Sequence, residues 1–367
     1  MSRTRCSFQR WPSEVWSFPV SVLDGAGGES RPADAAELVL SDVQLVVPLS
    51  EWPELTATVT PEQAVTLTPW RSVIYCVHDD MVVAACLVSS LVEKGDQVEV
   101  TGVGFAGVMK GMPWTAAPRK LYVYNTGQAF KDIWLHVQGS PGGNLGMVLT
   151  DFSTAATVGR GSAGGTVNEP FVLSPVETHD LSESIDLLVQ DGIEFRESHD
   201  LNGSHVLVVG TESDPIGADL TLDCRLEVGL NVTSALQVDL SAEDSPTGVL
   251  VTGGTDNPVW GVAYAPDAVG VRRVAAVTDV NATSNTDAAA RAQTRLAKFR
   301  RAAKQYTVTV VDTPLARLHG FAPGDTVAVH GTRWGGVDYV ATGRISSVTH
   351  KPGDGTADFD IVPTGGV

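Results

Sequence analysis

The last quarter of the chain constrains the fold most, because a basic amphipathic helix pattern leads directly into a series of short alternating segments. In residues 288–304, apolar side chains recur at steps of three and four, which places them on one side of an α-helix. Asn285, Thr286 and Asp287 offer capping chemistry at its start. The apolar side consists of Ala289, Ala292, Leu296, Phe299 and Ala303, and the basic stripe beside it consists of Arg291, Arg295, Lys298 and Arg301.

The residues that follow this helix predict a small β-barrel. Residues 306–311 alternate as a strand, Ala322-Pro-Gly-Asp325 favours a turn, and residues 326–329 return as a second strand. Two more strands are expected near residues 338–348 and 357–362.

Short strands also dominate residues 36–112. Turns at Asp79-Asp80 and at Lys94-Gly95-Asp96 separate the last three of them, which is typical of a meander. Strands at this spacing suggest a barrel or a sandwich. We expect them at residues 38–40, 43–48, 55–59, 64–67, 72–78, 81–89 and 97–103.

The segment between these two all-β blocks has a mixed pattern. It predicts helices at residues 128–138 and 181–190, a hairpin of residues 193–197 with 206–209, and a flexible Gly- and Ser-rich loop at 153–168. Further strands are expected at residues 220–228, 236–240, 249–252 and 260–264. The predicted fold class is mainly β with an α+β insertion: two small β-barrels and a middle α+β region. The expected domains are 1–112, 113–219 and 220–367, the last of which contains the basic helix 285–304.

Charge is distributed unevenly along the 367 residues, whose net charge is −18. Residues 151–260 contain 19 acidic residues against only Arg160, Arg196 and Arg225. A chain this acidic is poorly suited to binding nucleic acid, because phosphate contacts need Lys and Arg. The acidic block is consistent either with a solubilising surface or with the lining of a path along which DNA slides without adhering. The cationic helix, in contrast, is expected to lie on an anionic surface.

The cysteines and the apolar runs bear on the compartment. Cys6, Cys76, Cys86 and Cys224 have neither metal-like spacing nor a short-domain disulfide pattern, which favours ordinary thiols in a reducing compartment. No apolar run follows the basic N-terminus, and the longest run, residues 81–88, is too short to span a membrane. We therefore expect neither a signal peptide nor a membrane anchor.

Motifs that carry catalytic chemistry are weak or missing. Two Gly-x-Gly-x-x-Gly matches, at residues 102–107 and 159–164, lack the acidic residue and the alternating β-α context of a dinucleotide site. Metalloprotease, nucleophile-elbow and phosphate-loop motifs do not occur. The sequence thus predicts a protein that is not an enzyme and has no cofactor or metal. A glycosidase pair of carboxylates stays open, because such pairs are defined by separation in space.

Three histidines invite a metal hypothesis that the pattern does not favour. His199 and His205 flank Leu-Asn-Gly-Ser, which indicates a hairpin turn with surface histidines. His179 precedes Asp180, which is expected to cap the second helix.

Tryptophans are concentrated near the N-terminus. Five of the eight lie in the first 114 residues: Trp11, Trp16, Trp52, Trp70 and Trp114. They are either sugar-stacking platforms of a receptor-binding module or anchors of cores and subunit contacts, and the enrichment of tryptophan at interfaces favours anchors.

Several segments, in this order, resemble a known family. They are Leu67-Thr-Pro-Trp-Arg71, the hairpin 73–87, the strand 98–104, residues 176–188 with Ile193-Glu-Phe195, Tyr306-Thr-Val-Thr-Val310, Phe321-Ala-Pro-Gly-Asp-Thr-Val327 and Gly343-Arg-Ile-Ser-Ser-Val-Thr349. Together they resemble the tail-tip hub, or minor tail, proteins of long-tailed phages of actinobacteria. The chain departs from that pattern at residues 112–119, where many members are arginine-rich and this chain has only Arg119.

The resemblance implies a homotrimer whose two tail-tube-like barrels per chain form a pseudo-sixfold ring. Such a ring joins the tail tube or distal tail protein to tip or fibre proteins at the virion tail tip, and genomic DNA passes through its lumen without specific binding. Candidate interface residues are the basic Arg291, Arg295, Lys298 and Arg301 with the apolar Leu296 and Phe299. The alternative is a carbohydrate-binding receptor adhesin or a distal tail protein that contacts the host cell wall.

Overall fold

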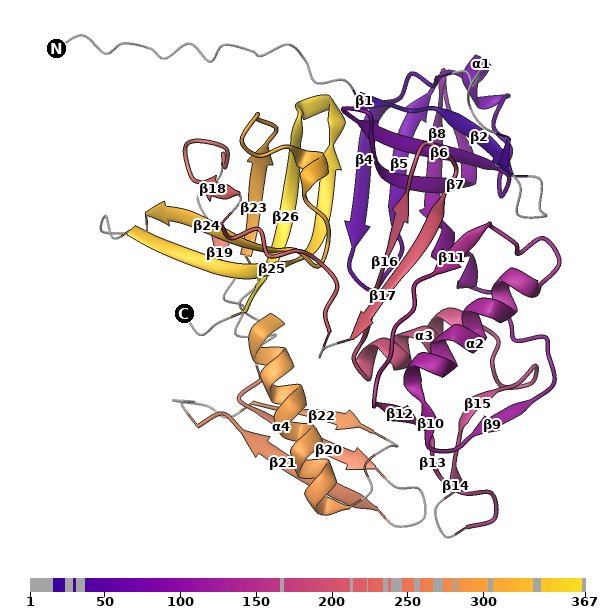
Figure 1. The fold of residues 1–367 in the computed structure, drawn as a ribbon, viewed down its shortest axis with the longest axis vertical. Coiled ribbons are helices and arrows are strands. Elements are labelled where there is room, and N and C mark those ends of the chain that lie inside the picture. Colours follow the sequence, from indigo (N-terminus) through magenta and orange to yellow (C-terminus); the bar gives the residue numbers. More distant parts are fainter. Residues whose placement is uncertain are drawn as a thin grey trace.

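The computed structural model describes residues 16–23, 29–30, 37–165, 168–211, 214–222, 224–233, 237–238, 246–253, 258–266, 273–279, 282, 284–302, 306–332 and 338–364. Figure 1 shows four parts. The first β-domain (residues 16–109, indigo to purple) lies beside the second β-domain (residues 214–238 and 306–364, mostly gold and yellow). The middle region (residues 110–211, magenta) lies below the first, and the α/β module (residues 246–302, orange) lies below the second.

The first β-domain is a curled sheet in which the predicted meander is confirmed as the order β8-β7-β6. All seven residues of β6 are buried, because the sheet is covered on both faces. Val73 and Tyr75 face a core shared with the middle region, whereas Ile74 and Cys76 face a core inside the curled sheet. The elements are β1 Trp16–Ser17, β2 Val20–Leu23, β3 Glu29–Ser30, β4 Ser41–Pro48, β5 Glu54–Val59, α1 Pro61–Ala64, β6 Ser72–His78, β7 Met81–Lys94, β8 Gln97–Gly104 and η2 Phe105–Met109.

The strand predicted at residues 64–67 is wrong, because the short helix α1 ends at Ala64 and a turn follows it. Thr60 is its N-cap and accepts a hydrogen bond from Gln63 N, and Pro61 occupies the first turn, where a missing N–H costs nothing. Local capping thus overrides the β-propensity of Val65 and Thr66.

The second β-domain confirms the four strands predicted after the basic helix. Its elements are β18 Arg225–Glu227, β19 Gln237–Val238, β23 Tyr306–Val311, η3 Leu318–Gly320, β24 Thr326–Thr332, β25 Asp338–Lys351, η4 Pro352–Asp354 and β26 Thr356–Pro363. Burial alternates strictly along β26, as expected for a strand with one face toward a core.

One strand pair joins the two β-domains into a single 14-stranded sheet. β25 pairs antiparallel with β4, from Ser347 opposite Pro48 to His350 opposite Leu45. The two domains are therefore the two curled halves of one sheet, and the expectation of two small β-barrels stays a prediction.

The middle region confirms both predicted helices and the predicted hairpin. Phe130 and Trp134 of α2 and Ile185 of α3 pack into the core that the first β-domain shares, so one core crosses residue 112. The predicted domain boundaries stay predictions. The elements are β9 Arg119–Leu121, β10 Tyr124–Asn125, α2 Thr126–Gly139, β11 Met147–Leu149, β12 Thr157–Val158, β13 Arg160–Gly161, β14 Asn168–Glu169, β15 Phe171–Leu173, α3 Leu181–Gln190, β16 Ile193–His199 and β17 His205–Thr211. Short strands thus run through the predicted loop 153–168.

The hairpin β16–β17 is held against the second β-domain by partly buried charges. Arg344 of β25 forms a bidentate ion pair with Glu194, with Nη2 2.7 Å from Oε2, and its Nε donates to Gly324 O at 2.8 Å. Arg196 donates to Pro323 O at 3.0 Å. Fork-shaped pairing of this kind fixes direction as well as distance.

The α/β module consists of a three-stranded sheet covered by one helix. Its elements are β20 Gly248–Gly253, β21 Val259–Tyr264, β22 Val274–Thr278 and α4 Asn285–Ala302, in the strand order β21-β20-β22. The sequence predicted β20, β21 and the helix but not β22, which lies parallel to β20. Gly261 permits the close approach of α4, because a Cβ there would lie 2.1 Å from Ala289 N.

Replacing Arg344 with Ala is expected to lower the free energy of unfolding by about 2–3 kcal/mol, because Glu194 then stays largely buried without its partner. Chemical denaturation measures the change. Arg225→Ala is the control, since the Arg225–Glu227 pair is exposed and is expected to contribute under about 1 kcal/mol. Equal effects of the two variants would contradict a locking role for Arg344.

Gly261→Ala is expected to destabilise the α/β module by about 2–3 kcal/mol, since the added methyl group meets the backbone of α4. Thermal unfolding monitored by circular dichroism checks this. The control is Gly139→Ala at the end of α2, where a Cβ meets nothing within 4 Å, and it is expected to leave stability unchanged or slightly raised. An unfolding curve of Gly261→Ala that overlays the wild type would show that α4 does not pack this closely.

Candidate functional site

The junction between the two β-domains gathers buried and half-buried side chains from distant parts of the chain. We call this set the junction cluster: Trp16, His78, Asp312, His319 and His350. His78 ends β6, directly before a hairpin turn in which Asp79 and Asp80 have φ values of 48° and 63°. Such a turn matches the twist of the strands, and aspartate tolerates the left-handed region better than most residues.

The carboxylate of Asp312 links the two sides of the junction. Its Oδ1 accepts a hydrogen bond from Leu318 N at 3.2 Å, which positions the loop that leads into η3. Its Oδ2 lies 2.6 Å from His78 Nε2, in a close contact that does not have the geometry of a hydrogen bond. On the other edge of the same ring, His78 Nδ1 lies 3.1 Å from His319 Nδ1. Asp312 therefore holds both histidine-bearing segments together.

Aromatic contacts complete the cluster. The ring centroid of Trp16 lies 4.8 Å from that of His78 and 5.5 Å from that of His350. Burial, with a smaller contribution from His78 nearby, lowers the pKa of His350 to about 3, although Asp312 partly opposes the shift. Burial also lowers the pKa of His319. Both rings are thus neutral near pH 7.

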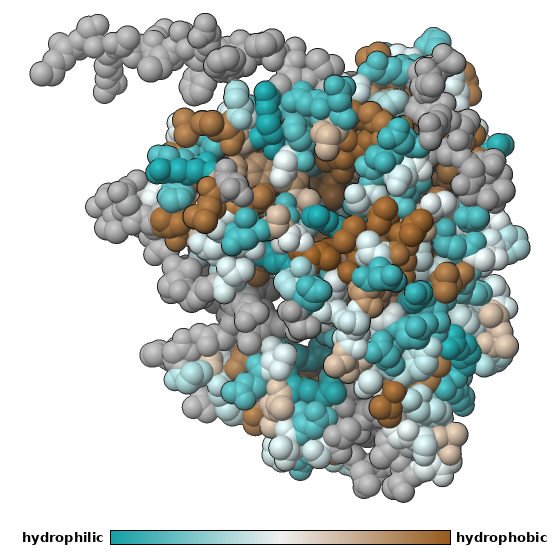
Figure 2. All heavy atoms as spheres, viewed as in Figure 1, coloured by the Kyte–Doolittle hydropathy of each residue, from teal (hydrophilic) through white to brown (hydrophobic). Residues whose placement is uncertain are grey.

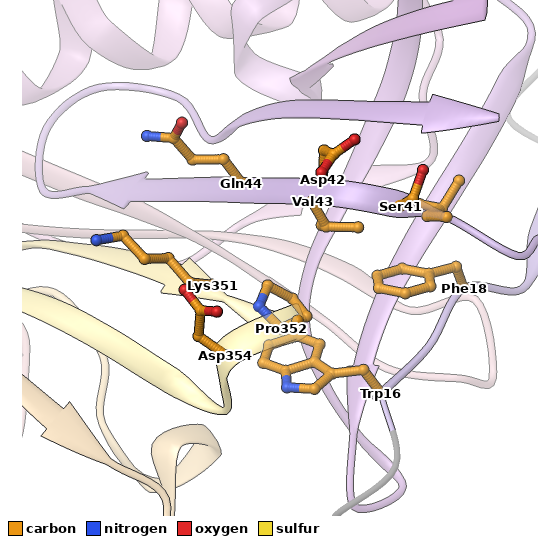
Figure 3. Close-up of a pocket in the computed structure, with 11 residues that line it drawn as sticks. Trp16, Phe18, Ser41, Asp42, Val43, Gln44, Lys351, Pro352 and Asp354 are labelled. Carbon is orange, nitrogen blue, oxygen red and sulfur yellow. The ribbon is translucent and has the colours of Figure 1, made fainter. Parts of the chain in front are cut away.

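A pocket of about 660 Å³ opens beside the cluster, between the start of β4 and the turn after β25. Figure 3 shows the ring of Phe18, the indole of Trp16 and Pro352 along its apolar side, with the polar ends of Gln44, Asp354 and Lys351 on the other. Its walls come from both β-domains, so its shape depends on the β4–β25 pairing.

The structure corrects the expectation that His199 and His205 lie on the surface of a hairpin. Both are buried, with Nδ1 atoms 2.9 Å apart. His199 Nε2 lies 3.1 Å from Glu197 Oε2, and His205 Nε2 lies 3.5 Å from the Tyr75 hydroxyl. Tyr75, which contacts His205, comes from β6, and the local turn signal could not show this contact.

Glu197 also explains the first glycine motif. Its carboxylate accepts hydrogen bonds from Phe105 N at 2.9 Å and Ala106 N at 2.7 Å, directly after Gly104. A Cβ at Gly104 would lie 2.7 Å from Glu197 Oε1, so the glycine admits this carboxylate. Amide groups that would face a phosphate in a nucleotide site here bind the chain's own side chain.

The predicted anionic support of the basic helix lies within the α/β module. Arg291 and Arg295 both contact the buried carboxylate of Asp279, at 3.2 and 3.3 Å, and Arg291 also pairs with Asp287. Leu296 is buried in the core of the module, which also contains Ala288 rather than the predicted Ala289. The side chains of Lys298, Phe299 and Arg301 lie outside the described residues. An interface role for these six candidates stays a prediction.

The tryptophans singled out by sequence differ in their exposure. Trp114 is buried and Trp52 packs against the shared core, as expected of anchors, whereas Trp70 is 54% exposed.

Asp180 caps α3 as predicted, because its side chain accepts a hydrogen bond from Ser182 N. Burial raises the pKa of the free thiol of Cys76 to about 12, so this group is inert near pH 7. Cys6 and Trp11 lie outside the described residues.

The surface divides into apolar and polar areas. Figure 2 shows brown residues gathered over the middle of one face, where the two β-domains and the hairpin β16–β17 meet, and mostly teal or pale residues over α4 and α2. Among the described residues, no helix combines the length and the apolar character needed to cross a membrane.

Comparison with solved structures places this architecture among known folds. The tail protein from Neisseria meningitidis MC58 is 15% identical and has a TM-score of 0.61, with 95% of this chain and 97% of that one covered. The 43 kDa tail protein of prophage MuSo2 from Shewanella oneidensis is 13% identical and has a TM-score of 0.60, with 95% and 98% covered. This chain has the fold of phage tail proteins.

The tail-protein fold extends to a chain of the Francisella PdpA-VgrG complex, which is 8% identical with a TM-score of 0.53. That match covers 95% of this chain and 57% of the other. No protein-family model matches the sequence, and no curated protein matches it. The predicted resemblance to tail proteins is confirmed at the level of the fold.

His350 makes the junction acid-sensitive. Because its pKa is lower in the folded chain than in the unfolded one, the unfolded chain binds more protons between pH 6.5 and about 3, so stability falls as the pH falls through this range. We expect His350→Gln to reduce the slope by about 1.4 kcal/mol per pH unit relative to the wild type.

Denaturant unfolding at a series of pH values measures both slopes. His179→Gln, at an exposed position, is the control and should keep the wild-type slope. If the wild type and His350→Gln lose stability in parallel on acidification, the buried imidazole is not the group responsible.

Proposed function

We propose that this chain is a structural, non-enzymatic component of a phage tail tip: a trimeric hub that connects the tail tube to distal tip or fibre proteins. The observation that carries the proposal is the pairing of β4 with β25, which makes two small curled β-domains one rigid unit. The fold shared with tail proteins over 95% of this chain supports it.

The geometry suits a change of symmetry. Three copies of a chain with two similar β-domains present six such domains around a closed ring, as cyclic assembly allows. One side of the ring then meets a sixfold tube, and the other side offers a threefold base to the tip. The resemblance of several segments to hub proteins favours a long-tailed phage of actinobacteria as the source.

The acidic character of the chain fits a conduit. We propose that part of the acidic block 151–260 faces the lumen, where like charge keeps passing DNA from adhering. The proposal requires no specific nucleic-acid contact and places the protein at the virion tail tip.

A receptor adhesin is the alternative, and the exposed Trp70 and Trp260 are the described aromatic side chains that it would use. It predicts saturable binding of cell-wall glycan that is lost when these residues are replaced with Ala. The hub requires no such binding.

Self-association tests the hub directly. Size exclusion with light scattering is expected to give a mass of about 116 kDa, three times the chain mass of 38.6 kDa. Arg301→Glu, at a nominated interface position, is expected to lower the trimer fraction, whereas Arg225→Glu, at an exposed position of the second β-domain, is not. A monomer at every concentration that also binds glycan through Trp70 or Trp260 would overturn the hub in favour of the adhesin.

A further inference from the structure

Two imidazole rings from opposite sides of the junction face each other through their Nδ1 atoms. His78 Nδ1 and His319 Nδ1 are 3.1 Å apart, although 241 residues separate them in the sequence. A ligand atom of Asp79 completes a group of three whose ligand atoms all lie within 4.8 Å of one another. Two nitrogen ligands of one tetrahedral zinc ion, each about 2.0–2.1 Å from the metal, lie about 3.3 Å apart. The observed spacing is therefore close to that of two ligands of one ion.

We propose that His78, His319 and Asp79 bind a divalent transition-metal ion of the zinc class, which fastens the first β-domain to the second. This inference does not rest on the proposed tail-tip function. It assigns a site from the contacts at the junction alone.

The surroundings of His78 resemble the second shell of a metal-bound histidine. Such a histidine commonly places its other ring nitrogen beside a carboxylate, which orients the ring and raises the basicity of the ligand. Asp312 Oδ2 lies 2.6 Å from His78 Nε2, which leaves Nδ1 directed at His319. The same carboxylate accepts from Leu318 N, next to His319, so one buried group positions both ligands.

The chemistry of the donors selects the class of metal. Two imidazole nitrogens and one carboxylate oxygen suit zinc, cobalt or nickel, whereas calcium and magnesium prefer oxygen ligands alone. Three ligands from the chain leave a fourth position for water. Asp79 lies in the turn that follows β6. About a third of its side chain is accessible to solvent, which gives an ion a route to the site.

One nearby cation has to be accommodated. Arg317 Nη1 lies 3.4 Å from Asp79 Oδ2 and 4.0 Å from Asp312 Oδ1. A metal ion therefore competes with this guanidinium for the Asp79 carboxylate. Binding is expected to draw Asp79 from Arg317 toward the metal.

Cobalt provides a direct probe. Protein stripped with a chelator and titrated with Co²⁺ is expected to develop visible d–d absorption that saturates at one equivalent per chain and disappears when Zn²⁺ is added. The melting temperature is expected to rise with Zn²⁺, because an ion that binds only the folded chain stabilises it. His319→Ala should abolish both signals, and His179→Ala, which removes an exposed histidine elsewhere, should leave both unchanged.

Asp79→Asn keeps the test decisive if His319→Ala does not fold. Asparagine tolerates the φ of 48° at this turn, and the variant is expected to weaken Co²⁺ binding at least about tenfold while the apo-protein keeps its melting temperature. Absence of stoichiometric Co²⁺ binding by the wild type would overturn the proposal. Unchanged affinity in both variants would overturn it equally.

Discussion

The antiparallel pairing of β4 with β25 is the contact on which the rest of the architecture depends. It uses backbone groups, so it sets the separation and the direction of the two β-domains without requiring particular side chains. The connection continues past the paired residues, since Leu49 N donates to Ser346 O and Ser50 N donates to Phe195 O, each at 2.8 Å. The second of these bonds brings the hairpin β16–β17 to the same place. First β-domain, second β-domain and middle region thus meet along one line.

Two carboxylates along that line are paired with groups from another part of the chain. Glu194 pairs with Arg344 across the hairpin and the second β-domain, and Glu197 accepts from the amide groups that open η2. Removing a carboxylate from water costs several kcal/mol unless such partners replace the lost hydration. The pairs therefore discriminate strongly against any other arrangement of the parts, while apolar burial in the shared core supplies most of the attraction.

Local patterns predicted most of the elements, and contacts between distant residues account for the failures. Alternation and capping sufficed for β23, β26 and α3, because their signals lie within about ten residues. His199 and His205 were placed wrongly because Tyr75, which contacts His205, is 130 residues away. The sequence also could not show that His78 and His319 lie together, because ligand motifs are recognised by spacing along the chain and these two residues belong to different β-domains. The sequence did not predict the short strand β22, because its pairing with the neighbouring β20 is what makes these residues a strand.

The α/β module does not depend on the contacts between the two β-domains. Its core contains only its own residues, and Asp279 satisfies Arg291 and Arg295 within the module. Its shape therefore follows from its own sequence, whereas the curled halves of the large sheet depend on one another through the junction. A scaffold of this design keeps the relative placement of the two β-domains fixed and leaves the outer face of a self-contained module free to vary. In the ring that we propose, this separation would place rigidity and variation in different parts of the same chain.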